Sequence, residues 1–300
     1  MQDSIPVVSV CIPTYRAADH LAATIESVLA QTFADFELVI VDDNSPDRTA
    51  EIVAGYRDSR LRYLQNPANL GPEGNWNRCL DQARGRYFKL LPQDDLLAPD
   101  CLARQVAVFE LDAAQRIALV FGAREVVDAD GKPLLRRATF GKRAKCVSAR
   151  DLIRACLRKG SNVIGEPGNV LLRRNLADSV GRFDATHGYV IDLDYWFRAL
   201  QRGDGYYLPD VLSSFRISGK SWSVEIGARQ YHEYRDFARK YAADPAYRIG
   251  KTDLALATAM AYANARLRRI AYWWLLPKQG AAAGAGASAA EVGETTRTRS

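Results

Sequence analysis

Short apolar runs, each followed by polar residues and a helical segment, dominate the first part of this sequence. The runs at 7–12, 38–41 and 87–91 are almost continuously apolar, which is typical of strands buried on both faces of a parallel sheet. Similar runs at 61–64 and 117–121 predict two more strands. After the first run, apolar residues recur at helical spacing at Leu21, Ile25, Val28 and Leu29. Strands and helices in alternation predict an α/β fold with a doubly wound, mostly parallel sheet.

Beyond about residue 122 the alternation becomes less regular. Apolar runs at 170–172 and 211–212 predict strands of a smaller, mixed region, with a helix expected over 191–200 between them. The stretch from about 225 to 276 is predicted to be helical throughout. The last residues, 279–300, are rich in Ala and Gly and then polar, which predicts disorder.

The charge and the cysteines limit the classes of partner and site. The net charge of +6 favours anionic partners such as nucleic acid, anionic lipids or nucleotide diphosphates. The five Cys form no C-x-x-C pair, so neither a zinc site nor a disulfide framework is indicated, and a reducing compartment is expected. Residues 1–6 lack a basic region ahead of an apolar core, so we expect no signal peptide and a cytoplasmic protein. No apolar run reaches the length of a membrane span.

Carboxylates follow two of the predicted strands at the points where these strands end. Asp42 and Asp43 follow the run at 38–41, and Asp94 and Asp95 follow the run at 87–91. Ligands of open α/β sheets bind beyond the carboxyl ends of the strands, and crowded carboxylates repel one another unless a cation or hydrogen-bond donors intervene. A divalent cation shared with a diphosphate is one solution. Hydrogen bonds to a base or ribose are a second, and a simple helix cap is a third.

Taken together, these segments resemble the family-2 inverting glycosyltransferases of the GT-A fold. The resemblance covers roughly residues 5 to 220 and depends on the order and spacing of several short motifs. The motifs are Val8 to Tyr15, Gln31-Thr32-Phe33, Val41 to Ser45, Asn69-Leu70-Gly71, Ala83 to Tyr87, Leu91 to Asp95, Gly181 to Asp184 and Asp192 to Arg198.

The resemblance implies a site for a nucleotide-sugar donor and a metal ion. The donor site would consist of Pro13, Thr14, Tyr15, Asp42, Asp43, Asn69, Gly71, Arg78 and Asp94. Within this set, Asp43 would bind the uracil or an equivalent base. Asp95 would be the main protein ligand of Mg²⁺ or Mn²⁺, with Asp94 near the ribose or the metal. Arg78 is a candidate diphosphate contact, because Trp76 stands where the family often has Arg.

Asp192 matches the general base of the family, which removes the proton of the acceptor hydroxyl. A base on the face opposite the leaving group would give a single displacement with inversion at the anomeric carbon. The alternative is a capping role, because an acid near a helix start is favoured by the helix dipole whatever its chemistry. Asp194 stands four residues before Arg198 and is expected to form a helix ion pair.

Two departures from the family pattern concern the metal. Pro92 replaces an Asp that is common two residues before the metal pair, and Ile217-Ser218 follow Arg216 where many relatives carry a His. A third protein ligand is therefore not indicated. His187, in the loop before Asp192, is expected at the surface or in contact with an acceptor.

The resemblance divides the chain into four parts. Residues 1–121 would be the nucleotide-sugar-binding half and 122–224 the acceptor-binding half of the same GT-A domain, followed by a C-terminal helical region at 225–278 and a disordered tail at 279–300. The expected activity is metal-dependent transfer of a sugar, from a UDP-sugar by preference, to a glycan or lipid-linked acceptor in polysaccharide biosynthesis. The alternatives are a non-catalytic sugar-nucleotide-binding protein and another nucleotide-using transferase, such as a nucleotidyltransferase.

Basic and aromatic residues cluster near the end of the predicted helical region. They are Arg266, Arg268, Arg269, Tyr272, Trp273, Trp274, Leu275 and Leu276. This mixture suits an anionic membrane surface, so peripheral attachment to the inner face of the membrane is one expectation. Packing onto the catalytic domain or into an oligomer is another. Nucleic acid is not an expected partner, and the sequence does not predict an oligomeric state.

Overall fold

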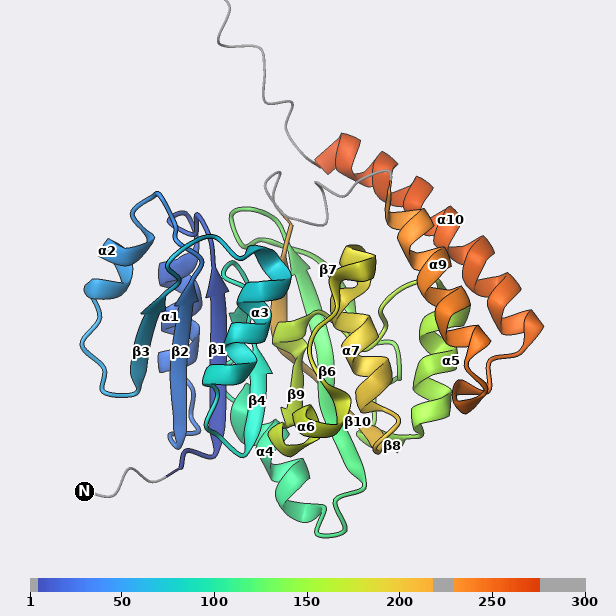
Figure 1. Ribbon diagram of the computed structural model, residues 1–300, viewed down its shortest axis with the longest axis horizontal. Coiled ribbons are helices and arrows are strands. Elements are labelled where there is room, and N and C mark those ends of the chain that lie inside the picture. The colour runs from blue at the N-terminus through green and yellow to red at the C-terminus, as the bar shows by residue number, and fades with distance from the viewer. Residues whose placement is uncertain (1–4, 218–228, 276–300) are drawn as a thin grey trace, which may run out of the picture.

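The computed structural model describes residues 5–217 and 229–275, with side chains described as far as residue 268. Within these residues the chain forms one ten-stranded sheet with helices on both faces (Figure 1). The predicted α/β class is confirmed.

Four strands from the first 90 residues form the parallel part of the sheet. They are β1 (Val8–Thr14), β2 (Phe36–Asp42), β3 (Leu61–Gln65) and β4 (Tyr87–Leu90). β1 pairs in parallel with β2 and β4, and β2 pairs in parallel with β3. Every residue of β1 and β2 is buried, as expected for strands that are covered on both faces.

The other strands make the sheet mixed. They are β5 (Leu96–Leu97), β6 (Ile117–Val127), β7 (Pro133–Arg137), β8 (Lys145–Val147), β9 (Val170–Arg173) and β10 (Asp204–Arg216). β9 lies antiparallel between β4 and β6, whereas β10 runs parallel to β6. The main strand order is β3-β2-β1-β4-β9-β6-β10-β5, with β7 paired to β6 and β8 paired to β10. The second half is therefore mixed, as the sequence predicted.

Helices cover the two faces of this sheet. They are α1 (Leu21–Leu29), α2 (Thr49–Ala54), α3 (Gly71–Gln82), α4 (Cys101–Leu111), α5 (Ala149–Lys159), α6 (Ala177–Val180), α7 (Ile191–Ala199), α9 (Gln230–Ala243) and α10 (Lys251–Leu275). Side chains alternate along β1, so Val10 and Ile12 join the core under α1 and α4, whereas Cys11 joins the core under α3 and α7.

The C-terminal region consists of two helices, so the prediction of one continuous helix is wrong at 244–250. A 3₁₀ turn at Pro245–Tyr247 follows α9, and Arg248 adopts a left-handed conformation with φ of 51°. Proline disfavours helical geometry in the residue before it, and Asp244 is extended. Of the described helices, none is both long enough and apolar enough to cross a membrane.

Two of the arginines considered for a membrane face are engaged within the C-terminal region. Arg266 Nη2 donates to Tyr262 Oη at 2.8 Å, and Arg268 Nη1 donates to Gln230 Oε1 at 3.1 Å. The side chains from Arg269 onward lie outside the described residues. Attachment to a membrane therefore stays a prediction.

The strand directions bring distant loops to one edge of the sheet. The carboxyl ends of β1, β2, β4, β6 and β10 meet there, together with the amino end of the antiparallel β9. This edge carries the polar residues that the sequence marked at strand ends.

Asp253, near the start of α10, joins this helix to α5. Its carboxylate pairs with Arg154 at 3.1 Å and with Arg158 at 2.7 Å, and its side chain is 1% exposed. Burial opposes ionisation, but the hydrogen bonds from the two arginines outweigh it and hold the pKa of Asp253 below its usual value.

We expect Asp253→Asn to lower the free energy of unfolding by about 2 kcal/mol at neutral pH, because two arginines lose a buried charged acceptor. A carboxyl whose folded pKa is lowered contributes its stability above the unfolded pKa of about 4 and loses it as the pH falls. The difference between wild type and variant should therefore narrow below about pH 4. Urea unfolding at several pH values measures this. Asp236→Asn, which removes an exposed pair with Arg235, should leave stability nearly unchanged, and equal effects of both variants would contradict the prediction.

Candidate active site

Asp43, directly after β2, organises the loop that leads into α3. Its Oδ1 accepts hydrogen bonds from Asn66 Nδ2 at 2.7 Å and from the Leu70 amide at 2.8 Å, and its Oδ2 accepts one from the Gly71 amide at 2.9 Å. Gly71 has φ of 73°, and a Cβ there would meet nothing, so the backbone conformation is what favours glycine. Asn69 Nδ2 donates to the carbonyl of Asp43 at 3.2 Å. A carboxylate has about four acceptor positions, which leaves roughly one for a ligand.

Asp42 has the partners of a structural residue. It is fully buried, and its Oδ1 accepts hydrogen bonds from the amide and the hydroxyl of Ser45. Its Oδ2 accepts from Tyr63 Oη at 2.6 Å, and burial together with this carboxylate raises the pKa of the Tyr63 phenol. Asp42 therefore joins β2, β3 and the turn after β2, and a role in donor binding stays a prediction for it.

The loop after β1 is bound to the loop that carries the Asp94–Asp95 pair. The Tyr15 amide donates to Gln93 Oε1 at 2.7 Å, and Gln93 Nε2 donates back to the Tyr15 carbonyl at 3.1 Å. The Thr14 carbonyl accepts from the Asp43 amide at 2.8 Å. Pro13 and Thr14 are buried, whereas Tyr15 is 38% exposed, with the Arg16 guanidinium 5.2 Å from the centroid of its ring. Gln93 was not predicted, although its place beside the acidic pair was the available signal.

Asp94 and Asp95 lie at the end of β4, against the end of β10. Asp95 Oδ1 accepts from the Arg216 amide at 3.0 Å, and Arg216 Nε donates to the Asp94 carbonyl at 3.0 Å. Asp95 is only 2% exposed. Burial, and then the charge of Asp94, raise the pKa of Asp95 well above its usual value, and burial raises the pKa of Asp94. Two adjacent carboxylates with too little compensating charge are a place where a cation stabilises the ionised forms.

The carboxylates at this edge fit a hard divalent ion that takes further ligands from elsewhere. Among the residues that the structure describes, no group of three or more His, Cys, Asp and Glu side chains could hold a metal. Mg²⁺ usually binds one or two carboxylates together with substrate phosphates and water. The oxygen donors of Asp94 and Asp95 agree with that pattern.

Asp192 is the second residue of α7 and lies on the other side of the site. Its Oδ1 accepts from the Leu193 amide at 2.7 Å, and its Oδ2 accepts from Asn162 Nδ2 at 2.8 Å. Burial is the main cause that raises the pKa of Asp192 to about 7; the charge of Glu166 adds to it, and the two hydrogen bonds oppose it. A carboxylate that titrates near neutral pH has the property that a general base needs.

Three residues that the sequence did not mark connect the two sides of the site. The charge of Glu166, in the loop before β9, raises the pKa of both Asp95 and Asp192, so it lies near both. Glu166 forms an ion pair with Arg124 of β6, and Arg124 Nη2 donates to the Asn162 carbonyl at 3.0 Å. These residues belong to segments far apart in the sequence, and no local pattern distinguished them.

Arg78 and Trp76 of α3 have less defined relations to the site. Arg78 Nε is buried and has no hydrogen-bond partner among the residues that the structure describes, and its part as a diphosphate contact stays a prediction. Trp76 packs edge-on against Phe183, with ring centroids 5.4 Å apart. The side chain that replaces the usual arginine of the family is therefore a core contact between α3 and the segment before α7.

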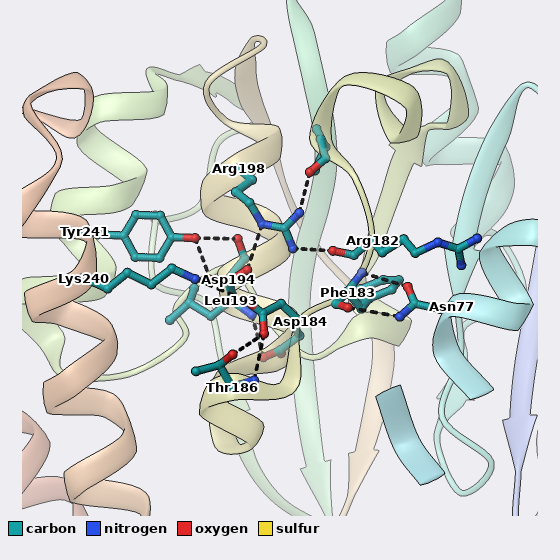
Figure 2. Close-up of polar contacts among 12 residues, drawn as sticks. Asn77, Arg182, Phe183, Asp184, Thr186, Leu193, Asp194, Arg198, Lys240 and Tyr241 are labelled. Carbon is teal, nitrogen blue, oxygen red and sulfur yellow. Dashed lines mark hydrogen bonds and ion pairs between the residues drawn. The ribbon is translucent and has the colours of Figure 1, made fainter. Parts of the chain in front are cut away.

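Asp194, two residues after Asp192, is fully engaged in structure (Figure 2). Its Oδ2 accepts from Arg198 Nε at 2.8 Å, which confirms the predicted helix pair, and its Oδ1 contacts Lys240 Nζ at 2.9 Å and Tyr241 Oη at 2.7 Å. Lys240 and Tyr241 belong to α9, so this carboxylate attaches α7 to the C-terminal helices. The helix that carries Asp192 is thereby held from outside the sheet.

The loop before Asp192 is also attached to the C-terminal region. It contains the 3₁₀ segment Ala185–Val190, whose Tyr189 amide donates to Glu233 Oε2 of α9 at 2.6 Å. Arg268 of α10 contacts Tyr189 Oη. His187 lies within this 3₁₀ segment, and contact with an acceptor stays a prediction for it.

Sequence comparisons find relatives of known class. The sequence model of glycosyl transferase family 2 matches residues 9–180. TuaG of Bacillus subtilis (strain 168), a provisionally assigned teichuronic acid biosynthesis glycosyltransferase, is 35% identical over 248 residues, which cover 78% of this chain and 89% of TuaG. WfgD of Escherichia coli, a UDP-Glc:α-D-GlcNAc-diphosphoundecaprenol β-1,3-glucosyltransferase, is 34% identical over 122 residues, which cover 41% of this chain and 47% of WfgD.

The fold has a counterpart of the GT-A class among solved structures. TarS 1–349 of S. aureus, in complex with UDP-GlcNAc, superposes with a TM-score of 0.66 over 87% of this chain and 72% of that one. The sequence identity is 20%, so this likeness concerns the fold. The predicted GT-A-like architecture is confirmed.

Asp194→Asn should lower the free energy of unfolding by about 3 kcal/mol, because it leaves Arg198 and Lys240 without their shared buried counter-charge. Asp192→Asn is the matched comparison two residues away. Burial disfavours the ionised form of Asp192, so its ionisation costs stability as the pH rises through about 7. The amide removes that cost but turns its NH₂ toward one of the two donors of Asp192, so Asp192→Asn should lose much less stability than Asp194→Asn at pH 8. Urea unfolding of both variants measures the contrast. Equal losses of stability would mean that both carboxylates are structural.

Proposed function

Because the chain belongs to glycosyl transferase family 2, we propose that it is a metal-dependent inverting enzyme that moves a sugar from a nucleotide-sugar donor to a hydroxyl group of a glycan or lipid-linked acceptor. That the chain is a glycosyltransferase follows from the family match and from its similarity to TuaG over 78% of its length. The donor base, the metal, the acceptor and the roles of individual residues belong to the proposal.

The observation that carries the proposal is a line of contacts along the carboxyl edge of the sheet. It has two parts: one runs from Asp43 through Thr14, Tyr15 and Gln93 to Asp94 and Asp95, and the other from Glu166 through Arg124 and Asn162 to Asp192. The charge of Glu166 raises the pKa of Asp95 and so relates the two parts. Ligands of α/β sheets bind at this edge. The line supports a donor site at one end and an acceptor site at the other, with the metal pair between them.

A UDP-sugar is the donor that the observations favour. WfgD uses UDP-Glc by its name, and the structure of TarS contains UDP-GlcNAc. The remaining acceptor position of Asp43 suits the imide N–H of uracil, and the exposed ring of Tyr15 can stack on a base. Donors with dTDP or GDP are the alternatives to test.

A growing surface polysaccharide is the acceptor that the relatives suggest. TuaG is assigned to teichuronic acid synthesis, and the acceptor of WfgD is a sugar linked through diphosphate to undecaprenol. We therefore propose work at the inner face of a membrane, where a lipid-linked acceptor would present its hydroxyl group. The net charge of +6 agrees with an anionic acceptor or surface.

The proposed chemistry divides between the two sides of the site. Asp95 and Asp94 would hold Mg²⁺ or Mn²⁺ with the diphosphate oxygens and water, and the bound ion would offset the charge that develops on the leaving diphosphate. Asp192 takes the proton of the acceptor hydroxyl while the oxygen of this hydroxyl attacks the anomeric carbon. The bond from this carbon to the diphosphate oxygen breaks, and its electron pair leaves with the nucleoside diphosphate. Attack from the face opposite the leaving group inverts the anomeric configuration.

Asp95→Asn should reduce the release of nucleoside diphosphate by about 100-fold or more, because the leaving charge loses its main stabilising partner. A screen of UDP-, dTDP- and GDP-sugars with Mn²⁺ measures this release, and EDTA should abolish it reversibly. Asp100→Asn, which removes an exposed pair with Arg104, is the control and should keep full activity. Unchanged release by Asp95→Asn, or full release in EDTA, counts against the metal site.

The pH dependence of kcat/KM should report the protonation of Asp192. A base acts in its ionised form, so activity should rise about tenfold per pH unit below the pKa of about 7 and level off above it. Asp192→Asn should lose about 10²- to 10⁴-fold in kcat and keep its affinity for UDP, measured by calorimetry. Near-normal transfer by this variant would refute the assigned base.

A further inference from the structure

We infer that Asn162 is a positioning residue for the reaction, and that the Arg124–Glu166 ion pair holds it against Asp192. The inference rests on the proposed role of Asp192 as the general base. The turn from Asn162 to Glu166 thereby controls both the direction and the ionisation of that carboxylate.

The amide group of Asn162 has one orientation in this turn. Its Oδ1 accepts from the amides of Ile164 at 3.1 Å and Gly165 at 2.9 Å. Its Nδ2 donates to the Gly165 carbonyl at 2.8 Å and to Asp192 Oδ2 at 2.8 Å. A rotated amide would bring its oxygen against the Asp192 carboxylate and its NH₂ against two N–H groups, so the turn itself selects the donor that faces Asp192.

Both oxygens of Asp192 are held from different elements. Oδ2 is bound by Asn162, and Oδ1 by the Leu193 amide of its own helix. One bond to each oxygen prevents rotation of the carboxylate while further lone pairs remain for an acceptor hydroxyl. Fixing the reacting group in this way is how enzymes avoid an entropic loss during the reaction.

The turn is attached to β6 at two points. Arg124 Nη2 donates to the Asn162 carbonyl at 3.0 Å, and Asn169 Nδ2 donates to the carbonyls of Gly122 at 2.9 Å and Ile164 at 2.8 Å. Gly165 has φ of 127°, and a Cβ there would lie 2.5 Å from Asn169 Nδ2. The position of Asn162 therefore follows from the sheet and does not depend on Asp192.

A buried ion pair holds a turn only at a large cost in desolvation free energy. The Arg124 side chain is 2% exposed, and Glu166 is its acidic partner. Desolvation of two charges often outweighs their attraction, so an apolar pair would hold the turn at least as well. The pair differs from an apolar one in placing a negative charge near Asp192. That charge raises the pKa of Asp192, whereas the Asn162 hydrogen bond lowers it.

Among the residues that the structure describes, Glu166, Arg124 and Cys156 are the charged or titratable groups related to Asp192. Glu166 faces it from the loop before β9, and its charge is balanced in part by Arg124 of β6. The thiol of Cys156, on α5, also lies within electrostatic range of Asp192 and Arg124, and burial raises the pKa of this thiol to about 12. The thiol is neutral near pH 7, so Glu166 and Asn162 are the groups whose removal should move the titration of Asp192.

The test compares the pH dependence of kcat/KM in two variants, with UDP release from the UDP-sugar that the donor screen selects and Mn²⁺ as the ion. Asn162→Ala removes the hydrogen-bond donor to Asp192. The acidic limb of the pH profile should therefore move up by about one pH unit, with kcat about tenfold lower. Glu166→Gln removes the charge and keeps the shape, so the limb should move down by about half a unit or more. Shifts in opposite directions support the inference.

Two control variants show whether a shift of the acidic limb is specific to the surroundings of Asp192. Asn264→Ala removes an amide that donates from α10 to the carbonyls of Lys159 at 2.7 Å and Gly160 at 3.1 Å, and Glu110→Gln removes an exposed pair with Arg86. Neither should move the limb. Should Asn162→Ala fail to fold, the isosteric Glu166→Gln still tests whether the charge of Glu166 controls the ionisation of Asp192.

Unmoved limbs in folded Asn162→Ala and Glu166→Gln overturn the inference. The Asp192→Asn variant tells this failure apart from failure of the proposed function. When Asp192→Asn is inactive and the acidic limbs of the other two variants do not move, the proposal that Asp192 is the base is kept and the positioning role of Asn162 is rejected. When Asp192→Asn transfers sugar normally, Asp192 is not the base, and the positioning role of Asn162 is rejected as well.

Discussion

The burial of carboxylates along one edge of a sheet is the constraint on which the rest of this structure depends. An ionised carboxylate out of water is costly unless hydrogen bonds or opposite charges surround it. Asp43 receives three such bonds from the loop before α3, which thereby acquires its shape. Among the described residues, Asp95 receives one hydrogen bond, from the Arg216 amide, beside the second charge of Asp94. That shortage of donors is the physical reason for proposing a cation there.

The second half of the chain adds further carboxylates near this edge, among them Glu166 and Asp192. The antiparallel β9 turns the loop around Glu166 to the same edge as the ends of β4 and β6. Asp192 comes from α7, which Asp194 binds to α9 through Lys240 and Tyr241 (Figure 2). The C-terminal helices (Figure 1) thus hold in place the helix that carries Asp192, the base of the proposed reaction.

The parts of the site that could be predicted are those whose position follows from a strand. Asp43 comes directly after the buried parallel strand β2, and Asp95 lies in the loop that follows the buried parallel strand β4. The carboxyl ends of such strands meet at one edge. Gln93, Glu166 and Asn162 escaped prediction because their roles arise from contacts between separate loops. The continuous helix expected over 225–276 failed for a local reason, since Pro245 forces the preceding residue out of helical geometry.

The amino-acid sequence alone determined the α/β class, the family, the carboxylates at the strand ends and the helix pair between Asp194 and Arg198, because each depends on residues close together in the chain. Only the tertiary structure decided that Asp42 bonds to Ser45 and Tyr63 and that Trp76 packs against Phe183. It also decided that Asp192 titrates near neutral pH through its burial, its contact with Asn162 and the charge of Glu166. Desolvation and charge act through space, so these properties exist only once the segments that carry Asn162, Glu166 and Asp192 have come together.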